Sequence, residues 1–176
     1  ETVTLKAPSK TGYTFAGWYD AETGGNEVTE ISKGSTGQKT VFARWNANDD
    51  TNYVVEHYQQ NIADDSYTLK ETEELTGTTA TTVEAQSITY TGFSENITHL
   101  SRLASGEVAA DGSLVLKLYY DRNEYTIDFD SVGGSNVESI TQKYDTAIAV
   151  PDAPTREGYT FDGWDKDIPA TMPAED

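Results

Sequence analysis

The chain has 176 residues and carries 12 Lys and Arg against 30 Asp and Glu, which gives a formal net charge of −18. So acidic a chain lacks the basic patch that binds nucleic acid, and an anionic membrane surface repels it. No apolar run approaches the roughly 18 residues of a membrane-spanning helix, and the longest, Leu114–Tyr120, is interrupted by Lys117. We therefore expect no nucleic-acid partner and no membrane insertion.

The composition favours β-structure. Threonine, tyrosine and valine are frequent, and these residues suit a pleated, half-buried surface. The length predicts one or two domains of roughly 100–200 residues each. The sequence has no cysteine, which excludes a disulfide framework and a thiolate metal site. The first residue is Glu1 rather than Met and no sorting signal is visible, so we expect a piece of a longer protein.

The first segment, residues 1–46, has the pattern of a small β-rich module. Gly12 predicts a turn, and the alternation from Tyr13 to Trp18 predicts a strand after it. A polar stretch then leads to a second strand, Thr40–Trp45, which closes the module. Large apolar rings are mostly buried. The expected core residues of this segment are Tyr13, Phe15, Trp18 and Trp45.

The middle segment, residues 47–123, has a different pattern and is bounded by short polar linkers. Ala110–Ser113 predicts a turn, and Ile97–Leu103 is expected to form one short helix. In the last expected strand, Leu116 and Leu118 share one face, which we expect to lie in the core. The expected strands are Tyr53–Tyr58, Tyr67–Leu69, Glu71–Leu75, Val83–Tyr90 and Leu114–Tyr120.

The third segment, residues 124–176, repeats part of the first. Ala153–Trp164 matches Ala7–Trp18 at an offset of 146, and eight of the twelve positions are identical. Internal identity of this length marks two copies of one unit. A hairpin is predicted ahead of the second copy, over Tyr125–Tyr144, because a Gly-Gly pair separates two strand-like runs. The expected core residues of this copy are Tyr159, Phe161 and Trp164.

The two copies are incomplete in opposite ways. The hairpin Tyr125–Tyr144 has no counterpart before the first copy, and Thr40–Trp45 has none after the second. An edge strand readily accepts a missing strand from another chain. One hypothesis is therefore self-association, in which one chain completes the partial repeat of another. The alternatives are that the two pieces complete each other within one chain, or that the true domain boundaries lie elsewhere.

The outer segments resemble the internalin-type B repeat, also called the Listeria–Bacteroides repeat. The resemblance covers residues 1–46, as the C-terminal part of one repeat, and residues 124–176, as the N-terminal part of a second. It rests on Y-x-x-x-F-D-S-x-G-G-S at Tyr125–Ser135, P-T-R-x-G-Y-T-F-x-G-W at Pro154–Trp164 and T-x-x-A-x-W at Thr40–Trp45.

The middle segment, residues 47–123, resembles the mucin-binding-protein (MucBP) type of repeat. The matching features are the opening strand Tyr53–Tyr58, then Leu75–Gly77, then Gly92-Phe93, and a closing strand after Ser105-Gly106. Both resemblances imply α+β modules of the β-grasp, ubiquitin-like type, in tandem in extracellular proteins attached to the bacterial cell wall. They imply no catalytic residue and no cofactor. We expect a β-rich α+β chain whose modules follow one another in an extended arrangement.

No group of residues has the pattern of an active site, so we expect no enzyme activity. His57 is expected in a strand and His99 in a loop or at a helix edge, and neither has a second ligand at metal spacing. The acidic pair Asp49-Asp50 offers oxygen ligands without the alternating acids of a calcium loop, and a calcium-stabilised rod stays an alternative. Lys117 is the lysine considered for an autocatalytic isopeptide bond to Asn, and the simpler interpretation is a solvent-facing strand residue.

Four tyrosines are the candidate binding residues. Tyr119 and Tyr120 are neighbours in one strand and are not expected to face the core together, while Tyr53 and Tyr58 lie on opposite faces of theirs. An exposed tyrosine ring stacks on a sugar, with its hydroxyl free to bond. The expected function is a stalk or spacer with neighbouring repeats as partners, or an adhesive module for host glycans or mucin. The alternative is a protein–protein interaction module completed by strand complementation.

Overall fold

A computed structural model describes residues 2–175 of the chain. Every regular element in this part of the chain is a β-strand, so the expected β-rich character is confirmed. The chain divides into two compact units, one of Glu1–Val55, Thr72–Ala85 and Leu103–Leu116, the other of Glu56–Glu71, Gln86–Arg102 and Lys117–Asp176. Each unit thus combines one outer repeat with part of the middle segment. The expected boundaries after residues 46 and 123 stay predictions.

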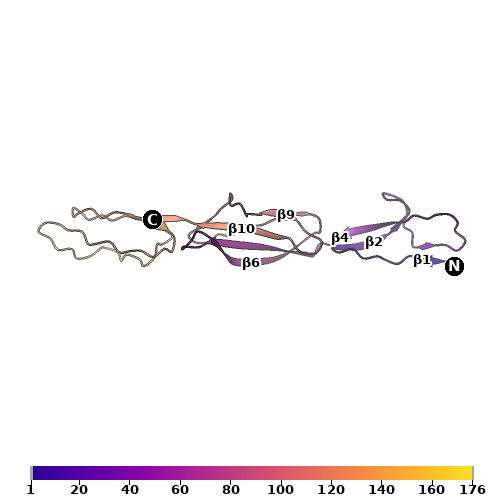
Figure 1. Cartoon of the computed structure of the whole chain (residues 1–176), viewed down its shortest axis with the longest axis horizontal. Coiled ribbons are helices and arrows are strands. Elements are labelled where there is room, and N and C mark those ends of the chain that lie inside the picture. Colours follow the sequence, from indigo (N-terminus) through magenta and orange to yellow (C-terminus); the bar gives the residue numbers. More distant parts are fainter. Residues whose placement is uncertain (1, 176) are drawn as a thin grey trace. The chain divides into compact units, whose positions relative to one another are not determined.

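The first repeat is built on one strand pair. β2 (Tyr13–Tyr19) pairs antiparallel with β4 (Phe42–Ala47), and these two strands lie side by side in Figure 1. A bulge between Phe15 and Gly17 shifts their register. β4 is the predicted closing strand, displaced by two residues from its expected bounds. A second, short pair is formed by β1 (Val3–Thr4) and β3 (Glu30–Ile31).

The middle segment contributes a four-stranded sheet, in the order β6-β5-β10-β8. The two strands expected between Tyr67 and Leu75 are one continuous strand, β6, and the strand expected at Val83–Tyr90 is reduced to the three residues of β7. β7 (Thr82–Glu84) pairs antiparallel with β9 (Ser105–Glu107). The sheet strands are β5 (Thr51–Gln60), β6 (Tyr67–Gly77), β8 (Phe93–Glu95) and β10 (Val115–Arg122).

The apolar core cluster of the first unit is built on one face of this sheet. Tyr53 and Val55 of β5 pack with Leu116 of β10, and Val108 closes the cluster. Alternate residues of a strand face the same side, and the next two of that face in β10, Leu118 and Tyr120, are also buried. One stripe of β10 is therefore core along its length.

The second repeat begins with a hairpin, as predicted. β11 (Glu124–Ile127) pairs antiparallel with β12 (Ile140–Lys143). After it, the chain near Met172 returns alongside the residues that follow β12. The Met172 N–H donates to the Thr146 carbonyl over 2.9 Å, and the Asp145 N–H donates to the Met172 carbonyl over 2.9 Å. The Met172 side chain is fully buried at this place.

The prediction of a short helix at Ile97–Leu103 is wrong. This segment forms turns, in which the His99 N–H donates to the Asn96 carbonyl over 3.3 Å. The side-chain oxygen of Asn96 also accepts the Thr98 N–H over 3.1 Å, and such local side-chain bonds compete with a helix. The α+β class and the β-grasp fold are accordingly not confirmed.

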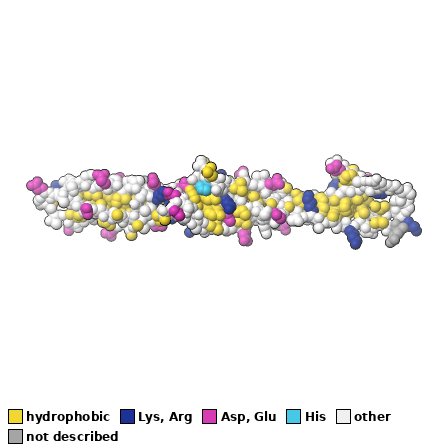
Figure 2. All heavy atoms as spheres, in the orientation of Figure 1, with side chains coloured by type: hydrophobic (Ala, Val, Ile, Leu, Met, Phe, Trp, Pro, Cys, Tyr) yellow, Lys and Arg dark blue, Asp and Glu magenta, His cyan; other side chains and the backbone are white. Residues whose placement is uncertain are grey.

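Two surface properties bear on function. Within the described residues, no helix has the length and apolar character needed to span a membrane. Figure 2 shows acidic side chains spread over the visible face among uncharged ones, with the basic side chains few and scattered. The net charge of −18 is thus not gathered into a single acidic patch on this face.

Candidate functional site

The most distinctive arrangement of polar groups lies where the first repeat meets the middle segment, and we call it the first joint. It consists of Gly12, Asn48, Thr79 and Ala110. The Asn48 N–H donates to the Gly12 carbonyl over 2.9 Å, and the Thr79 N–H donates to the Asn48 carbonyl over 2.8 Å. One linker residue is therefore held on both sides by main-chain hydrogen bonds.

The first joint requires glycine at its turn. Gly12 has a φ of 74°, and a methyl group at this position would lie 2.8 Å from the Cα of Ala110. A side chain is disfavoured at this φ, and it would also collide with the neighbouring loop. Two side-chain bonds add to the joint: the Thr14 hydroxyl donates to Asn48 Oδ1 over 2.8 Å, and the Thr51 and Thr79 hydroxyls pair over 2.6 Å.

The same arrangement recurs where the middle segment meets the second repeat. This second joint consists of Gly92, Asn123 and Tyr144. The Asn123 N–H donates to the Gly92 carbonyl over 2.9 Å, and the Tyr144 N–H donates to the Asn123 carbonyl over 2.8 Å. Gly92 has a φ of 77°, and a Cβ there would overlap the ring of Tyr144. The two joints share one hydrogen-bonding scheme although their side chains differ.

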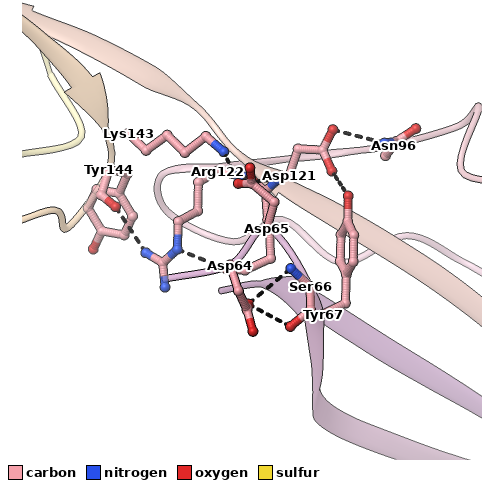
Figure 3. Close-up of polar contacts among 10 residues, drawn as sticks. Asp64, Asp65, Ser66, Tyr67, Asn96, Asp121, Arg122, Lys143 and Tyr144 are labelled. Carbon is pink, nitrogen blue, oxygen red and sulfur yellow. Dashed lines mark hydrogen bonds and ion pairs between the residues drawn. The ribbon is translucent and has the colours of Figure 1, made fainter. Parts of the chain in front are cut away.

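Arg122 reinforces the second joint from within β10. Its Nε donates to the Gln60 carbonyl over 2.9 Å, and its Nη1 donates to the Tyr144 carbonyl over 3.0 Å. The guanidinium also lies 4.8 Å from the centre of the Phe93 ring. Figure 3 shows Arg122 reaching toward Tyr144. A planar, five-donor group thereby connects β5, β8 and the second repeat.

Charged and phenolic groups surround Arg122. Lys143 of β12 forms an ion pair with Asp65, in the loop between β5 and β6 (Figure 3). Asp121 accepts a hydrogen bond from the Tyr67 hydroxyl and one from Asn96 Nδ2, the latter over 2.9 Å. Burial, and then the hydrogen bond to Asp121, raise the pKa of Tyr67 to about 12. The Tyr67 phenol is therefore neutral at physiological pH and donates to a carboxylate.

Of the four tyrosines predicted to bind sugars, three are buried and Tyr58 is half-buried. Tyr53 and Tyr120 lie in the apolar face of the sheet and are buried. On the opposite face, Tyr119 is stacked between His99, at 3.8 Å between ring centres, and Tyr58, at 5.0 Å. The expectation that Tyr119 and Tyr120 do not both face a core is wrong, because the turns at 97–102 cover the face that was expected to be open.

The two histidines lie in different surroundings. His57 is fully buried in β5, where its Nδ1 pairs with the Tyr120 hydroxyl over 2.9 Å, and that hydroxyl also accepts the Ile88 N–H over 3.0 Å. His99 lies in the turns that cover Tyr119 and stacks on its ring. In the described residues, no group of three or more His, Cys, Asp or Glu could hold a metal ion. The calcium alternative built on Asp49-Asp50 gains no support, since both residues are exposed.

Lys117 contacts a carboxylate rather than the asparagine that an isopeptide bond would need. Its Nζ lies 3.2 Å from Glu56 Oε2, which also accepts the Tyr58 hydroxyl over 2.6 Å. The hydrogen bond from Tyr58 and the interaction with Lys117 lower the pKa of Glu56, and the hydrogen bond to Glu56 raises the pKa of Lys117. The contact is a partly exposed ion pair on the same face of the sheet as Tyr58 and Tyr119.

The expected core residues of the two repeats differ in burial. In the first repeat Tyr13, Phe15, Trp18 and Trp45 are half-buried, and the Phe15 ring packs edge-on against Trp45 at 5.4 Å. In the second, Trp164 is half-buried, but Tyr159 is 68% and Phe161 38% exposed. The prediction that Tyr159 and Phe161 lie in a core is therefore wrong. Among the described residues no strand pairs with the segment that contains them, whereas in the first repeat β4 pairs with β2.

Sequence reasoning missed the residues of both joints. Arg122 and Lys143 lie in unremarkable strand sequences, and no local pattern indicates them. The glycines did carry a signal, because Thr11-Gly12-Tyr13 and Thr91-Gly92-Phe93 share a Thr-Gly-aromatic pattern across two segments that otherwise differ. An Asn followed by an acidic residue also recurs in both linkers, at Asn48-Asp49 and Asn123-Glu124.

Comparisons with known proteins bear on the outer segments and on the whole chain. A family model described as the Listeria-Bacteroides repeat domain matches residues 1–44 and 125–174. Internalin H of Listeria monocytogenes is 47% identical over 47 residues, which cover 26% of this chain and 9% of that protein. No solved structure matches.

Two proteins of Evansella cellulosilytica match nearly the whole chain. One, named as a Gly-rich membrane protein, is 29% identical over 175 residues, which cover 90% of this chain and 20% of that protein. The other, named as a membrane protein, is 28% identical over 169 residues, covering 91% of this chain and 24% of that protein. The chain therefore spans about a fifth to a quarter of the length of these relatives.

Proposed function

Because this chain belongs to the Listeria–Bacteroides repeat family, we propose that it is a non-catalytic segment of a bacterial surface protein, in which it acts as a stalk or spacer. The observation that carries the proposal is the joint. The same two main-chain hydrogen bonds hold the linker residue at Asn48 and again at Asn123. A spacer transmits position only when neighbouring modules are fixed to one another, and a linker bonded on both sides restricts their relative motion.

The relatives support this location and this modular order. Two of them are named as membrane proteins, and a third is an internalin. The Evansella matches cover 90% and 91% of this chain, so the middle segment accompanies the outer repeats in those proteins too. We propose that the segment lies on the outside of the cell and that other parts of the protein attach it to the wall.

The spacer proposal is tested by measuring how tightly the second joint holds its two sides. The sequence has no cysteine, so spin labels can be placed on cysteines introduced at the exposed positions Leu100 and Val132. We expect a narrow distance distribution that broadens in Asn123→Pro, which removes the N–H donor. Asn123→Ala keeps that donor and is the matched control. A broad distribution in the parent chain would contradict the spacer function.

Adhesion to mucin or other host glycans is a second proposal, and its candidate residue lies in the second repeat. The observation that favours a sugar ligand is the 68% exposure of Tyr159. The Arg156 guanidinium lies over its ring, 4.2 Å from the centre, and an exposed tyrosine ring suits a sugar. Binding to a glycan array and to immobilised mucin tests it. Saturable binding that Tyr159→Ala removes would support adhesion, and no retention of the folded chain would reject it.

A further inference from the structure

The second joint contains charged side-chain contacts besides its main-chain hydrogen bonds. Lys143 forms an ion pair with Asp65, and Asp145 Oδ2 lies 4.0 Å from Arg122 Nη1. Figure 3 shows the Lys143 side chain pointing toward Asp65. Tyr144 lies between the two charged residues in the sequence. We call Lys143, Tyr144 and Asp145 the docking tripeptide, because they present a positive, an aromatic and a negative group in consecutive positions.

The groups that contact the docking tripeptide come from three separate places in the middle segment, and we call them the acceptor site. Asp65 lies in the loop between β5 and β6, and Arg122 is the last residue of β10. Gly92 directly precedes β8, and Phe93 begins it. The Phe93 ring packs edge-on against Tyr144 at 5.9 Å between ring centres, and a Cβ at Gly92 would overlap the same ring. The acceptor site therefore offers a carboxylate, a space for a ring and a guanidinium, which complement the tripeptide group by group.

The second repeat holds the docking tripeptide in a fixed turn. The Thr146 N–H donates to the Lys143 carbonyl over 3.1 Å, which closes the turn. The Asp145 N–H donates to the Met172 carbonyl over 2.9 Å, which ties the turn to another part of the same repeat. A segment that its own module already orders loses little conformational entropy when it binds. The turn is therefore suited to specific recognition.

The backbone of Asp145 gives an independent indication that its side chain is used. Its φ is 66°, in the left-handed region. Glycine adopts this region without steric cost, whereas a residue with a Cβ is strained there. The carboxylate that aspartate supplies at this strained position is the group that lies near Arg122. Strain of this kind is often found at functional contacts.

The first joint, at the other end of the middle segment, makes its contacts with uncharged groups. Ala110 lies against Gly12, and the Thr14 hydroxyl donates to Asn48 Oδ1 over 2.8 Å. Its main-chain scheme is nevertheless that of the second joint. Main-chain groups cannot distinguish one neighbour from another, because almost every residue carries them. Any preference for a particular neighbour must therefore come from the side chains, which differ between the two joints.

We propose that the acceptor site selects the module that follows the middle segment. It binds a repeat in which the second strand of the first hairpin leads into a basic, an aromatic and an acidic residue, in that order. This proposal rests on the proposed function, since a spacer needs neighbouring modules that are joined in one defined way. The occupant is a repeat of the same surface protein, and in this chain it is the second repeat.

A neighbour with other residues at these three positions is disfavoured. Reversed charges would place a carboxylate against Asp65 and a cation against Arg122, and like charges at an interface act against the wrong partner. A small residue in place of Tyr144 would leave the space over Gly92 empty and would remove the ring that packs on Phe93. The charges thus fix the direction of the tripeptide, and the ring fixes its position.

Charge reversal in the full chain tests the acceptor site, with the spin-label pair at Leu100 and Val132 as the readout. We expect Asp65→Lys and Lys143→Asp each to broaden the narrow distance distribution of the parent, since each places like charges together. The double variant restores opposite charges and should recover the narrow distribution. Asp152→Lys makes the same change of charge at an exposed position outside the site, and it should leave the distribution unchanged.

The central ring and the acidic residue are tested in the same way. Tyr144→Ala is expected to broaden the distribution, whereas Tyr144→Phe keeps the ring and should not. Asp145→Asn removes the charge near Arg122 and is expected to broaden the distribution, although asparagine tolerates the left-handed backbone. Charge reversals and a Tyr144→Ala variant that all leave a narrow distribution would overturn the acceptor site. A double reversal that does not recover the narrow distribution would overturn the pairing of Lys143 with Asp65.

Chemical denaturation of unlabelled chains separates this proposal from the spacer function. In a double-mutant cycle of Asp65→Asn and Lys143→Gln, we expect the unfolding equilibrium constant of the double variant to be about threefold smaller than the single effects together predict, as for a partly exposed ion pair. A broad distance distribution in the parent chain would reject the spacer function. The cycle would still decide the acceptor site, because independent effects of the two substitutions would overturn it.

Discussion

The ring of Tyr144 occupies the space that a side chain at Gly92 would need. Gly92→Ala therefore combines a left-handed backbone strain with a collision, and we expect it to lower the free energy of unfolding by about 3 kcal/mol. Gly158→Ala is a matched control, because its φ is nearly the same and no atom lies within 4 Å; it is expected to lose only about 1 kcal/mol. Urea unfolding of both variants measures the difference, and equal losses would show that the Tyr144 contact does not matter.

Arg122 is expected to be sensitive even to conservative replacement. A lysine at this position keeps the charge but cannot donate from a planar fork to the carbonyls of Gln60 and Tyr144 together. We expect Arg122→Lys to destabilise the chain by about 2 kcal/mol in chemical denaturation. Arg156→Lys, at an exposed arginine with one carbonyl contact to Val132, is expected to lose about 0.5 kcal/mol or less. A loss of the same size in both variants would argue against the role of the guanidinium at the joint.

Tyr67 gives the chain a specific sensitivity to alkali. Its pKa is about 12 in the folded chain, above the ordinary value of 10.0, so the folded state holds the phenolic proton more tightly than the unfolded state. This contribution to stability is fully present below pH 10 and is lost as pH rises toward 12. We expect the unfolding midpoint of the parent chain to fall over this range. The midpoint of Tyr67→Phe should fall less steeply, and this variant should be about 1 kcal/mol less stable at pH 8. Parallel slopes for the two proteins would rule out Tyr67 as the cause.

The hydroxyl of Tyr120 is expected to be more important than its size suggests. It joins buried His57 to the Ile88 N–H, and removing it takes a partner from both. Tyr120→Phe is expected to lower stability by about 2 kcal/mol, seen as a lower unfolding midpoint. Tyr125→Phe, which loses one 3.3 Å contact with Asn123, is the control and should change stability by no more than about 0.5 kcal/mol. An unchanged midpoint in Tyr120→Phe would mean that other groups replace the hydroxyl.

Local sequence patterns were sufficient for most strands and for the hairpin. Alternation placed β2, β5 and β10, and the Gly-Gly pair placed the turn between β11 and β12, because each signal lies within a few consecutive residues. The turns at Ile97–Leu103 were misread as a helix, since the bond from Thr98 to the Asn96 side chain leaves no periodic signature. The wrong prediction that Tyr119 is exposed has the same origin, because those turns carry His99, which covers the Tyr119 ring.

The joints could not be predicted because their contacts are long-range and use the main chain. Asn48 and Gly12 are 36 positions apart, and Asn123 and Gly92 are 31 apart. The N–H and carbonyl groups that meet there are present in almost every residue. The glycine of the turn is therefore the main sequence signal of a joint. The family resemblance identified the outer repeats. The hydrogen-bonding scheme that the two joints share is seen only in the structure.

Recognition through the main chain has a consequence for how such proteins change over time. The linker residue contributes an N–H and a carbonyl at each joint, and the turn contributes a glycine carbonyl, so few side chains are fixed by the contact. The main-chain part of a joint can then persist when modules are exchanged, whereas side-chain contacts such as the ion pair of Lys143 with Asp65 require matched partners. The strict requirements are a glycine in the turn and any residue except proline in the linker. The main-chain part of each joint thus makes the order of modules less dependent on the side chains of the linker.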